Sequence, residues 1–249
     1  MDFVQSLERG LAVIQSFDAE HPHLTLSEVA ARTGLTRATA RRLLLTLGEL
    51  GYVATNGRRF SLTPRVLDIG YAYLSSLNVQ QIAQPYLEAL SERVHESVSV
   101  TVLDGADIVY VARVPTKRIM TISLGLGSRL PAYCTSMGRV LLAELTPDEL
   151  GGALPDSLEQ HTEHTVGTLA ELAVVLKQVR AQGWALVDQE LEIGLRSVAA
   201  PLRDASGRAV AAMNVSTQVA RTSVEQLHDE LVPDLVATAA RISEALAKR

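Results

Sequence analysis

The sequence of 249 residues has few groups that could form covalent cross-links or hold a metal. Its one cysteine, Cys134, excludes an intramolecular disulfide and a zinc site built on several thiolates. No apolar run approaches the roughly 20 residues that a membrane-spanning helix requires, so we expect no membrane partner. The first residues lack a charged segment followed by an apolar one, which predicts no signal peptide and a cytoplasmic location.

Motifs of catalysis and of cofactor binding are also missing. The chain has no Gly-rich phosphate loop, no HExxH and no GxSxG, so we expect no enzyme activity and no cofactor. His161 and His164 are the bases nearest to Cys134 in sequence, but a lone cysteine is more often a small buried apolar residue. His21 and His23 flank a proline and predict a turn rather than a metal site.

The composition indicates a folded protein with a local excess of positive charge. Hydrophobic residues make up 47% of the chain and charged residues 20%, which suits one large or two ordinary globular domains. The net charge is −5, yet positions 32–65 carry seven arginines and a single acid, Glu49, a local charge of +6. Such a patch on an acidic protein indicates a polyanion partner, with a solvated helix face as the alternative.

A helix–turn–helix is predicted around this basic window. Thr25 and Glu28 fit a capping box, and Gly34 supplies the left-handed residue that ends the helix they begin. Thr36 then caps a second helix. The apolar residues of that helix form one stripe, whereas cations and small residues occupy its exposed first turns. This pattern suits insertion into a major groove about 12 Å wide.

A basic hairpin is predicted after the second helix. Asn56 and Gly57 lie between two short strand-like runs and predict a tight turn, because both residues tolerate positive φ. Arg58 and Arg59 at the tip would meet backbone phosphate, as the wing of a winged helix does.

The part of the chain after position 62 predicts a linker helix and a second domain. A threonine and a proline at 63–64 begin the helix, with an ordinary fourth helix of the first domain as the alternative. Strand-like and helical patterns then alternate, which predicts an α+β domain with a mainly antiparallel sheet. The expected strands are 97–103, 108–113, 119–124, 197–202 and 209–216, and the expected helices are 82–95, 135–145, 169–182 and 224–248. The predicted boundaries are 1–62 for a winged helix-turn-helix, 63–78 for the linker and 79–249 for an effector-binding and oligomerisation domain.

A ligand pocket is expected at the start of the helix over 135–145. Thr135 and Ser136 follow an extended segment, and the free amides of a helix N-terminus favour an anion such as a carboxylate. The same hydroxyls could instead only cap the helix. Arg139 and Arg196 are candidate counter-charges for the carboxylate, but we expect each to form an ion pair within the fold.

Several stretches of the sequence resemble the IclR family of bacterial transcriptional regulators. The resemblance rests on FVQSLERGLAVIQSF, LSEVAARTGLTRATARRLLLTLGELGYV and GLRSVAAPL, and it covers nearly the whole chain. A further stretch, SRLPAYCTSMGRVLLA, is similar to the subgroup that controls protocatechuate and 4-hydroxybenzoate catabolism, the PcaR/PcaU/PobR type. The resemblance implies a winged helix-turn-helix, a linker helix and a GAF-like effector domain. It also implies dimers or tetramers on palindromic promoter sites and a small carboxylate effector.

Two sets of candidate site residues follow. The helix pattern and the hairpin predict DNA binding by Thr36, Arg37, Ala38, Thr39, Arg41, Arg42, Arg58 and Arg59. The resemblance implies effector binding by Ile119, Ile122, Tyr133, Ser136, Met137, Asp188, Ser197, Asn214 and Ser216. Some family members have cysteine where Ser197 stands and serine where Asn214 stands, so the identity of the ligand stays open.

The sequence thus predicts a DNA-binding regulator of aromatic-acid catabolism. Its effector would be protocatechuate, 4-hydroxybenzoate or β-ketoadipate, and it would act by favouring one geometry of the dimer. The linker helix would transmit that preference to the spacing of the two DNA-reading helices. The alternatives are a regulator of another carbon-source pathway, a small-acid enzyme with a structural winged module, and a protein–protein adaptor.

Overall fold

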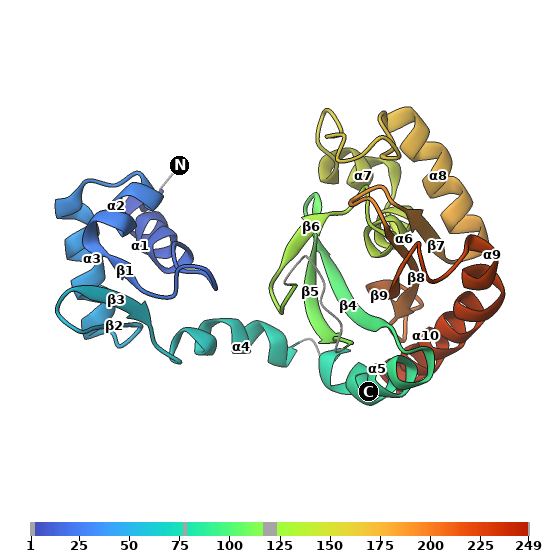
Figure 1. The fold of residues 1–249 in the computed structure, drawn as a ribbon, viewed down its shortest axis with the longest axis horizontal. Coiled ribbons are helices and arrows are strands. Elements are labelled where there is room, and N and C mark those ends of the chain that lie inside the picture. The colour runs from blue at the N-terminus through green and yellow to red at the C-terminus, as the bar shows by residue number, and fades with distance from the viewer. Residues whose placement is uncertain (1–2, 77–78, 117–123, 249) are drawn as a thin grey trace. The chain divides into compact units, whose positions relative to one another are not determined.

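A computed structural model describes residues 3–76, 79–116 and 124–248 (Figure 1). The chain divides into two compact units, Met1–Ser76 and Leu77–Arg249. The first combines helices with a small sheet, and the second combines helices with a larger antiparallel sheet. The predicted α+β fold class is therefore confirmed.

The first unit is a helix-turn-helix with a hairpin. Its elements are α1 (Gln5–Gln15), β1 (Leu24–Thr25), α2 (Leu26–Thr33), α3 (Arg37–Glu49), β2 (Val53–Thr55), β3 (Arg59–Leu62) and α4 (Val66–Ser76). The three strands form an antiparallel sheet in the order β1-β3-β2. Val13 of α1, Val29 of α2 and Leu44 of α3 are buried in one core, which holds the three helices together.

Local signals in the sequence set the ends of α2 and the start of α3. The Glu28 amide donates to Thr25 Oγ1 (3.3 Å), while the Thr25 amide donates to Glu28 Oε2 (2.6 Å), so the predicted capping box is confirmed. Gly34 adopts φ 67° at the C-cap of α2. Thr36 caps α3 by accepting a hydrogen bond from the Thr39 amide (3.2 Å).

The hairpin between β2 and β3 is present, but its turn differs from the expected one. Gly57 has φ 91°, whereas Asn56 is not in the positive-φ region. Asn56 acts through its side chain instead. Its Oδ1 accepts from the amides of Arg58 (3.1 Å) and Arg59 (2.9 Å), which closes a longer loop.

The second unit is built on a six-stranded antiparallel sheet in the order β6-β5-β4-β9-β8-β7. Its strands are β4 (Ser97–Asp104), β5 (Asp107–Val114), β6 (Arg129–Pro131), β7 (Ala185–Asp188), β8 (Leu195–Arg203) and β9 (Ala209–Gln218). Its helices are α5 (Val79–Val94), α6 (Ser136–Glu144), α7 (Pro147–Ala153), α8 (Leu169–Gln182), α9 (Val224–Gln226), a π-helical segment (Leu227–Leu231) and α10 (Val232–Ala247).

Helices cover both faces of this sheet. Helices α5 and α10 pack together against one face, and α6 packs against the other with α8 outside it (Figure 1). On the central strand β4, Thr101 faces α6, because its hydroxyl donates to Met137 Sδ (3.4 Å). By strand alternation Ser97 and Ser99 also face α6, whereas Val98 and Val100 face α5 and α10. The α6 side of the sheet is therefore unusually polar for a buried surface.

Some elements differ from the sequence-based expectation. The short strands β6 and β7 and the helix α7 were not predicted; the strands have only three and four residues, and α7 contains two glycines. The strand expected over 119–124 lies, apart from its last residue, outside the described residues; Leu124 itself is not in a strand.

The closing helix is not the continuous helix expected over 224–248. Residues Leu227–Leu231 form a π-helical segment between α9 and α10. Pro233 is the second residue of α10, and proline lacks the amide hydrogen that a regular helix needs. A local π-helical turn accommodates that loss. Among the described helices, none is long and apolar enough to cross a lipid bilayer.

Candidate functional site

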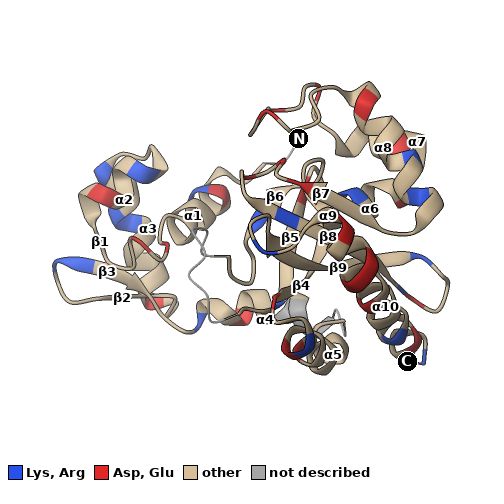
Figure 2. Ribbon diagram, turned by 45° about the vertical axis from the view of Figure 1, so that its right-hand side comes forward, with Lys and Arg blue, Asp and Glu red and all other residues tan. Residues whose placement is uncertain are grey.

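The first unit presents a cationic surface on α3. Arg37, Ala38, Arg41 and Arg42 are exposed, while Ala40, Leu44 and Leu47 of the same helix are buried. Thr36 is exposed at the N-cap and Thr39 is half-buried one turn later. The arginines of this unit lie on its helices, at the hairpin tip and just before α4 (Figure 2).

The arginines of the basic window differ in their partners. Arg32 forms an ion pair with Asp18, so its charge is already neutralised within the fold. The Arg65 guanidinium lies over the Tyr52 ring, 5.5 Å from its centroid. Within the described residues, by contrast, four arginines of α3 and the hairpin tip form no ion pair; these are Arg37, Arg41, Arg42 and Arg58. Arg59 lies close enough to Glu28 to contribute to lowering the pKa of that carboxyl. Unpaired exposed cations on one face suit a polyanion.

Arg58 and Arg59 have different surroundings at the hairpin. Both side chains are exposed. Arg59 Nη1 donates to the His23 carbonyl (3.3 Å), which fixes that arginine against the loop before β1. Arg58 has no such bond and extends from the tip, where it can reach a phosphate.

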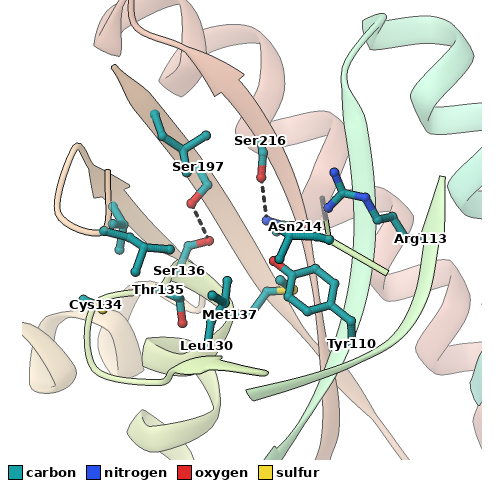
Figure 3. Close-up of a pocket in the computed structure, with 14 residues that line it drawn as sticks. Tyr110, Arg113, Leu130, Cys134, Thr135, Ser136, Met137, Ser197, Asn214 and Ser216 are labelled. Carbon is teal, nitrogen blue, oxygen red and sulfur yellow. Dashed lines mark hydrogen bonds between the residues drawn. The ribbon is translucent and has the colours of Figure 1, made fainter. Parts of the chain in front are cut away.

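The second unit contains a cavity between the polar face of the sheet and the start of α6 (Figure 3). Its volume is about 30 Å³, so in this structure it is a narrow space with room for about two water molecules. The lining residues are Tyr110, Arg113, Leu124, Leu130, Cys134, Thr135, Ser136, Met137, Val187, Leu191, Leu195, Ser197, Asn214 and Ser216.

Five of the predicted effector residues meet in this cavity. Ser197 on β8 lies opposite Ser216 on β9, and Asn214 lies two residues away on the same face of β9. Ser136 and Met137 come from the first turn of α6. The Ser197 hydroxyl donates to Ser136 Oγ (2.9 Å), which ties the sheet to the helix, and Asn214 Nδ2 donates to Ser216 Oγ (2.8 Å).

Asn214 has an incomplete set of hydrogen bonds. The residue is 4% exposed. Its Oδ1 is the one buried side-chain nitrogen or oxygen atom, among the residues that the structure describes, with no hydrogen-bond partner. An unsatisfied buried acceptor costs about 1–3 kcal/mol, so it favours a ligand that donates a hydrogen bond there.

A β-bulge brings two further residues into the cavity. Thr101 of β4 pairs with Tyr110 of β5, and Ser99 pairs with Arg113, so one extra residue, Val111, is accommodated between them. Without the bulge, positions 110 and 113 would face opposite sides of the sheet. Because Thr101 and Ser99 share a face, Tyr110 and Arg113 share it too. Neither residue was expected at the cavity from the sequence.

The two arginines considered as counter-charges are held in ion pairs, as expected. Arg139 lies in a buried fork with Glu190, with both N–O distances 2.5 Å. Glu190 also accepts from the Val166 amide (3.1 Å), so the pair fastens α6 to two loops. Arg196 forms a second fork with Asp188, at 2.8 and 2.9 Å.

Two predicted residues lie close to the cavity but do not line it. Asp188 follows Val187 on β7, so it faces the opposite side of the strand, where it binds Arg196. Tyr133 donates its hydroxyl to the Glu159 carbonyl (2.6 Å), away from the cavity. The predicted positions Ile119 and Ile122 lie outside the described residues.

Within the described lining of the cavity, the ionisable side chains are Tyr110, Arg113 and Cys134. Burial raises the pKa of the Cys134 thiol to about 12 and that of the Tyr110 phenol to about 12, so both groups are neutral near pH 7. Among the described lining residues there is no His, Asp or Glu that could act as a base. In the same described part of the chain, no group of three or more His, Cys, Asp or Glu side chains could hold a metal.

Comparison with known proteins places both units in one family. The model of the IclR helix-turn-helix domain matches residues 6–57, and that of the bacterial transcriptional regulator IclR C-terminal domain matches residues 71–244. The Pca regulon regulatory protein of Pseudomonas putida is 48% identical, over 95% of this chain and 82% of that protein. The p-hydroxybenzoate hydroxylase transcriptional activator of Acinetobacter baylyi is 35% identical, over 96% of this chain and 90% of that protein.

Solved structures agree with this assignment. The Rhodococcus sp. RHA1 protein RHA06195 is 59% identical, with a TM-score of 0.88 over 99% of both chains. The inducer-binding domain of PobR from Acinetobacter, a double mutant in complex with 3-hydroxybenzoic acid, is 30% identical. It has a TM-score of 0.61 over 66% of this chain and 97% of that one. On these grounds, the chain belongs to the IclR family of bacterial transcriptional regulators.

Proposed function

We propose that this protein regulates genes of aromatic-acid catabolism by binding promoter DNA under the control of a small aromatic carboxylate. The observation that carries the proposal is the pairing, in one chain, of an unpaired cationic α3 surface with a polar cavity on the sheet. The relatives named for the Pca regulon and for p-hydroxybenzoate hydroxylase support the choice of pathway. Bacterial promoter DNA lies in the cytoplasm, so we propose a cytoplasmic location for the protein.

On the DNA side, α3 would lie in the major groove. Its small residues allow close approach, and its arginines can form forked bonds to guanine or to phosphate. Arg58 would contact backbone phosphate beside the groove. The proposed contact residues are Thr36, Arg37, Ala38, Thr39, Arg41, Arg42, Arg58 and Arg59.

On the ligand side, the residues that line the cavity would contact the effector. Ser136, Ser197, Asn214 and Ser216 provide polar contacts, and Met137 packs beside them. Asp188 would act indirectly, because it holds Arg196 and so supports the strand that carries Ser197. With no base in the described lining and a neutral thiol, the cavity would bind its ligand without transforming it.

The working form would be a homodimer, alone or within a tetramer, on a palindromic site. Large apolar residues are exposed on α1 and on α4, and such surfaces mark protein interfaces. Two recognition helices must meet half-sites about 34 Å apart, or a multiple of that distance. A ligand that prefers one dimer geometry would change DNA affinity through that spacing.

Fluorescence anisotropy on DNA from upstream of the gene tests this function. We expect saturable binding that exceeds binding to scrambled DNA, weakens as salt rises and shifts with 4-hydroxybenzoate or protocatechuate. Arg41→Ala should reduce specific affinity by about 1–3 kcal/mol, while Arg208→Ala, an exposed arginine of the second unit, should not. Equal binding to scrambled DNA would refute sequence-specific regulation at this site. Unchanged binding by the Arg41 variant would remove that residue from the DNA-reading surface.

A further inference from the structure

The tip of the hairpin between β2 and β3 carries an asparagine followed by a glycine. The sequence has three asparagines, and Asn56 is the one that a glycine follows. Asn56 and Gly57 are both exposed, whereas Asn214 is 4% exposed. A side chain on the residue after an asparagine hinders its backbone nitrogen from attacking the asparagine amide, and glycine has no side chain. The tip therefore combines exposure with the least hindered sequence for that attack.

Hydrogen bonds at the tip polarise the side-chain amide of Asn56. Its Oδ1 accepts from the backbone amides of Arg58 (3.1 Å) and Arg59 (2.9 Å). Two donors on one carbonyl oxygen stabilise the negative charge that forms there when a nucleophile attacks the carbon, as an oxyanion hole does. Within the described residues, no hydrogen bond holds Asn56 Nδ2, the atom that has to leave in such a reaction.

A negative charge at position 56 would oppose the DNA contact proposed for this hairpin. Arg58 forms no ion pair within the described residues and extends from the tip, where it can reach a phosphate. The Asn56 oxygen already lies beside the backbone of Arg58 and of Arg59. A carboxylate in its place would attract the guanidinium groups and repel the phosphates that they would meet.

We propose that Asn56 is a site of spontaneous deamidation and that its conversion lowers the affinity of the protein for DNA. The Gly57 nitrogen forms a bond to Asn56 Cγ, the bond from Cγ to Nδ2 breaks, and the Gly57 amide proton leaves with Nδ2 as ammonia. Water then adds to one carbonyl of the cyclic imide and breaks one of its two bonds to nitrogen. The net change consumes water, releases ammonia and replaces an amide by a carboxylate. The effect on DNA rests on the proposed function, whereas the chemical step does not.

The two ways of opening the imide give products with different effects on the hairpin. Opening at Cγ gives an ordinary aspartate, whose carboxylate can keep both hydrogen bonds that the Asn56 oxygen accepts, so the turn is retained. Opening at the main-chain carbonyl gives isoaspartate and adds one carbon to the backbone. That product disturbs the pairing of Thr55 with Phe60 at the start of the hairpin. Both products place a negative charge at the tip.

Peptide mass spectrometry of the full chain, incubated in mildly alkaline buffer, tests the modification. Replacing an amide by a carboxylate adds about 1 Da to the peptide that contains it, and chromatography separates the two products. We expect the peptide with Asn56 to convert, while the peptide with the buried Asn214 keeps its mass. A synthetic peptide of residues 53–60 gives the rate without the fold. No conversion of native Asn56 in the time in which that peptide converts fully would overturn the proposal.

Two variants test the effect on DNA by fluorescence anisotropy across a salt series. Asn56→Asp, which reproduces the aspartate product, should weaken specific binding roughly 3- to 10-fold and reduce the slope of log affinity against log salt by about one. Asn56→Ser is the matched control, because serine is neutral, can still accept a hydrogen bond in the turn and cannot deamidate. It should bind as the fresh wild type does and keep its affinity during incubation. Thermal unfolding of each variant verifies that it is folded.

Other results would reject the link to DNA. Equal affinities of Asn56→Asp and the wild type would show that a carboxylate at the tip does not affect binding. Loss of affinity in incubated Asn56→Ser as fast as in the wild type would place the cause of the loss elsewhere. If the fresh wild-type protein showed no preference for the specific DNA, the proposed function would fall and the effect on DNA with it. The mass measurement would still decide whether Asn56 deamidates.

Discussion

At Cys134, burial decides the chemistry of the only thiol in the chain. The side chain is fully buried at the start of the segment that leads into α6, and its Sγ lies 3.8 Å from the Pro131 carbonyl. Removal from water disfavours the thiolate, which raises the pKa of the thiol to about 12. The residue is therefore a packing element of the cavity wall.

We expect native Cys134 to resist a disulfide reagent at pH 8. With a pKa of about 12, only about one thiol in 10,000 is ionised at that pH, and the thiolate is the reactive form. Labelling with Ellman's reagent should be negligible in buffer and reach one equivalent in guanidinium. Rapid stoichiometric labelling of the native protein would contradict this account and reopen the enzyme alternative.

The arginines of the second unit show what sequence can and cannot predict at this scale. The ion-pair role of Arg139 and Arg196 was expected, but not their partners, because Glu190 lies far from Arg139 in the chain. Arg113 was not expected at the cavity, because regular alternation of side chains along β5 would put Tyr110 and Arg113 on opposite faces of the sheet. The bulge at Val111 brings them to the same face, and that bulge depends on the pairing of β5 with β4.

Among the elements, those with local signals were predictable. The capping box at Thr25, the left-handed stop at Gly34 and the cap at Thr36 depend on residues a few positions apart, and all three are present. The hairpin at Asn56 and Gly57 was predicted as well, whereas the π-helical segment that interrupts the helix expected over 224–248 was not. The capping box also makes a contribution to stability that depends on pH.

In the Glu28→Gln variant, the stability of the first unit should fall less steeply as the pH is lowered. The Thr25 amide, its strongest partner, lowers the pKa of Glu28, so the folded state favours the charged form. That stabilisation is present above the unfolded pKa, about 4.3, and is lost as pH falls through the lower folded value. Glutamine keeps the hydrogen bond but has no charge.

Thermal unfolding between pH 7 and pH 3 measures the effect. The difference between wild type and variant should shrink toward pH 3, and Glu20→Gln, in an exposed loop, should follow the wild type. A constant difference across this range would contradict the linkage.

The start of α6 depends on a glycine. A Cβ on Gly138 would lie 2.1 Å from the Ala132 carbonyl oxygen and 2.3 Å from the Ala132 Cα, so any side chain must displace backbone. Because this close contact positions Ser136 and Met137, Gly138 controls the wall of the cavity as well as the stability of the helix.

Gly138→Ala should therefore destabilise the protein by about 1–3 kcal/mol and weaken ligand binding. Gly151→Ala in α7 is the matched control, since its Cβ would meet nothing within 4 Å and alanine is the better helix former. Urea unfolding gives the free energies. Equal stabilities of the two variants would contradict the proposed close packing.

At the scale of the whole molecule, α1 and α4 each present large apolar side chains to solvent. Leu67 on α4 is 73% exposed, and Leu7 on α1 is 63% exposed. Water-exposed side chains of this size are expected to be covered in the working assembly.

Leu67→Glu should weaken the proposed dimer, because association would bury a charge without a partner. Sedimentation velocity should shift from twice the chain mass of 26.8 kDa toward one chain mass, with a parallel loss of DNA affinity. Leu126→Glu, an exposed leucine of the second unit, should keep the wild-type mass. A dimer that tolerates the Leu67 change would place the interface elsewhere.

The buried fork between Arg139 and Glu190 restricts how this protein can diverge. Replacing either residue leaves the other charge buried without a partner, which costs about 3–5 kcal/mol of stability. Both positions are therefore expected to change together or to stay the same. Ser197, Asn214 and Ser216 are short, uncharged side chains on neighbouring strands, so replacing one of them leaves no buried charge without a partner. The Arg139–Glu190 pair is thus retained or replaced as a unit, whereas single mutations can change the ligand preference.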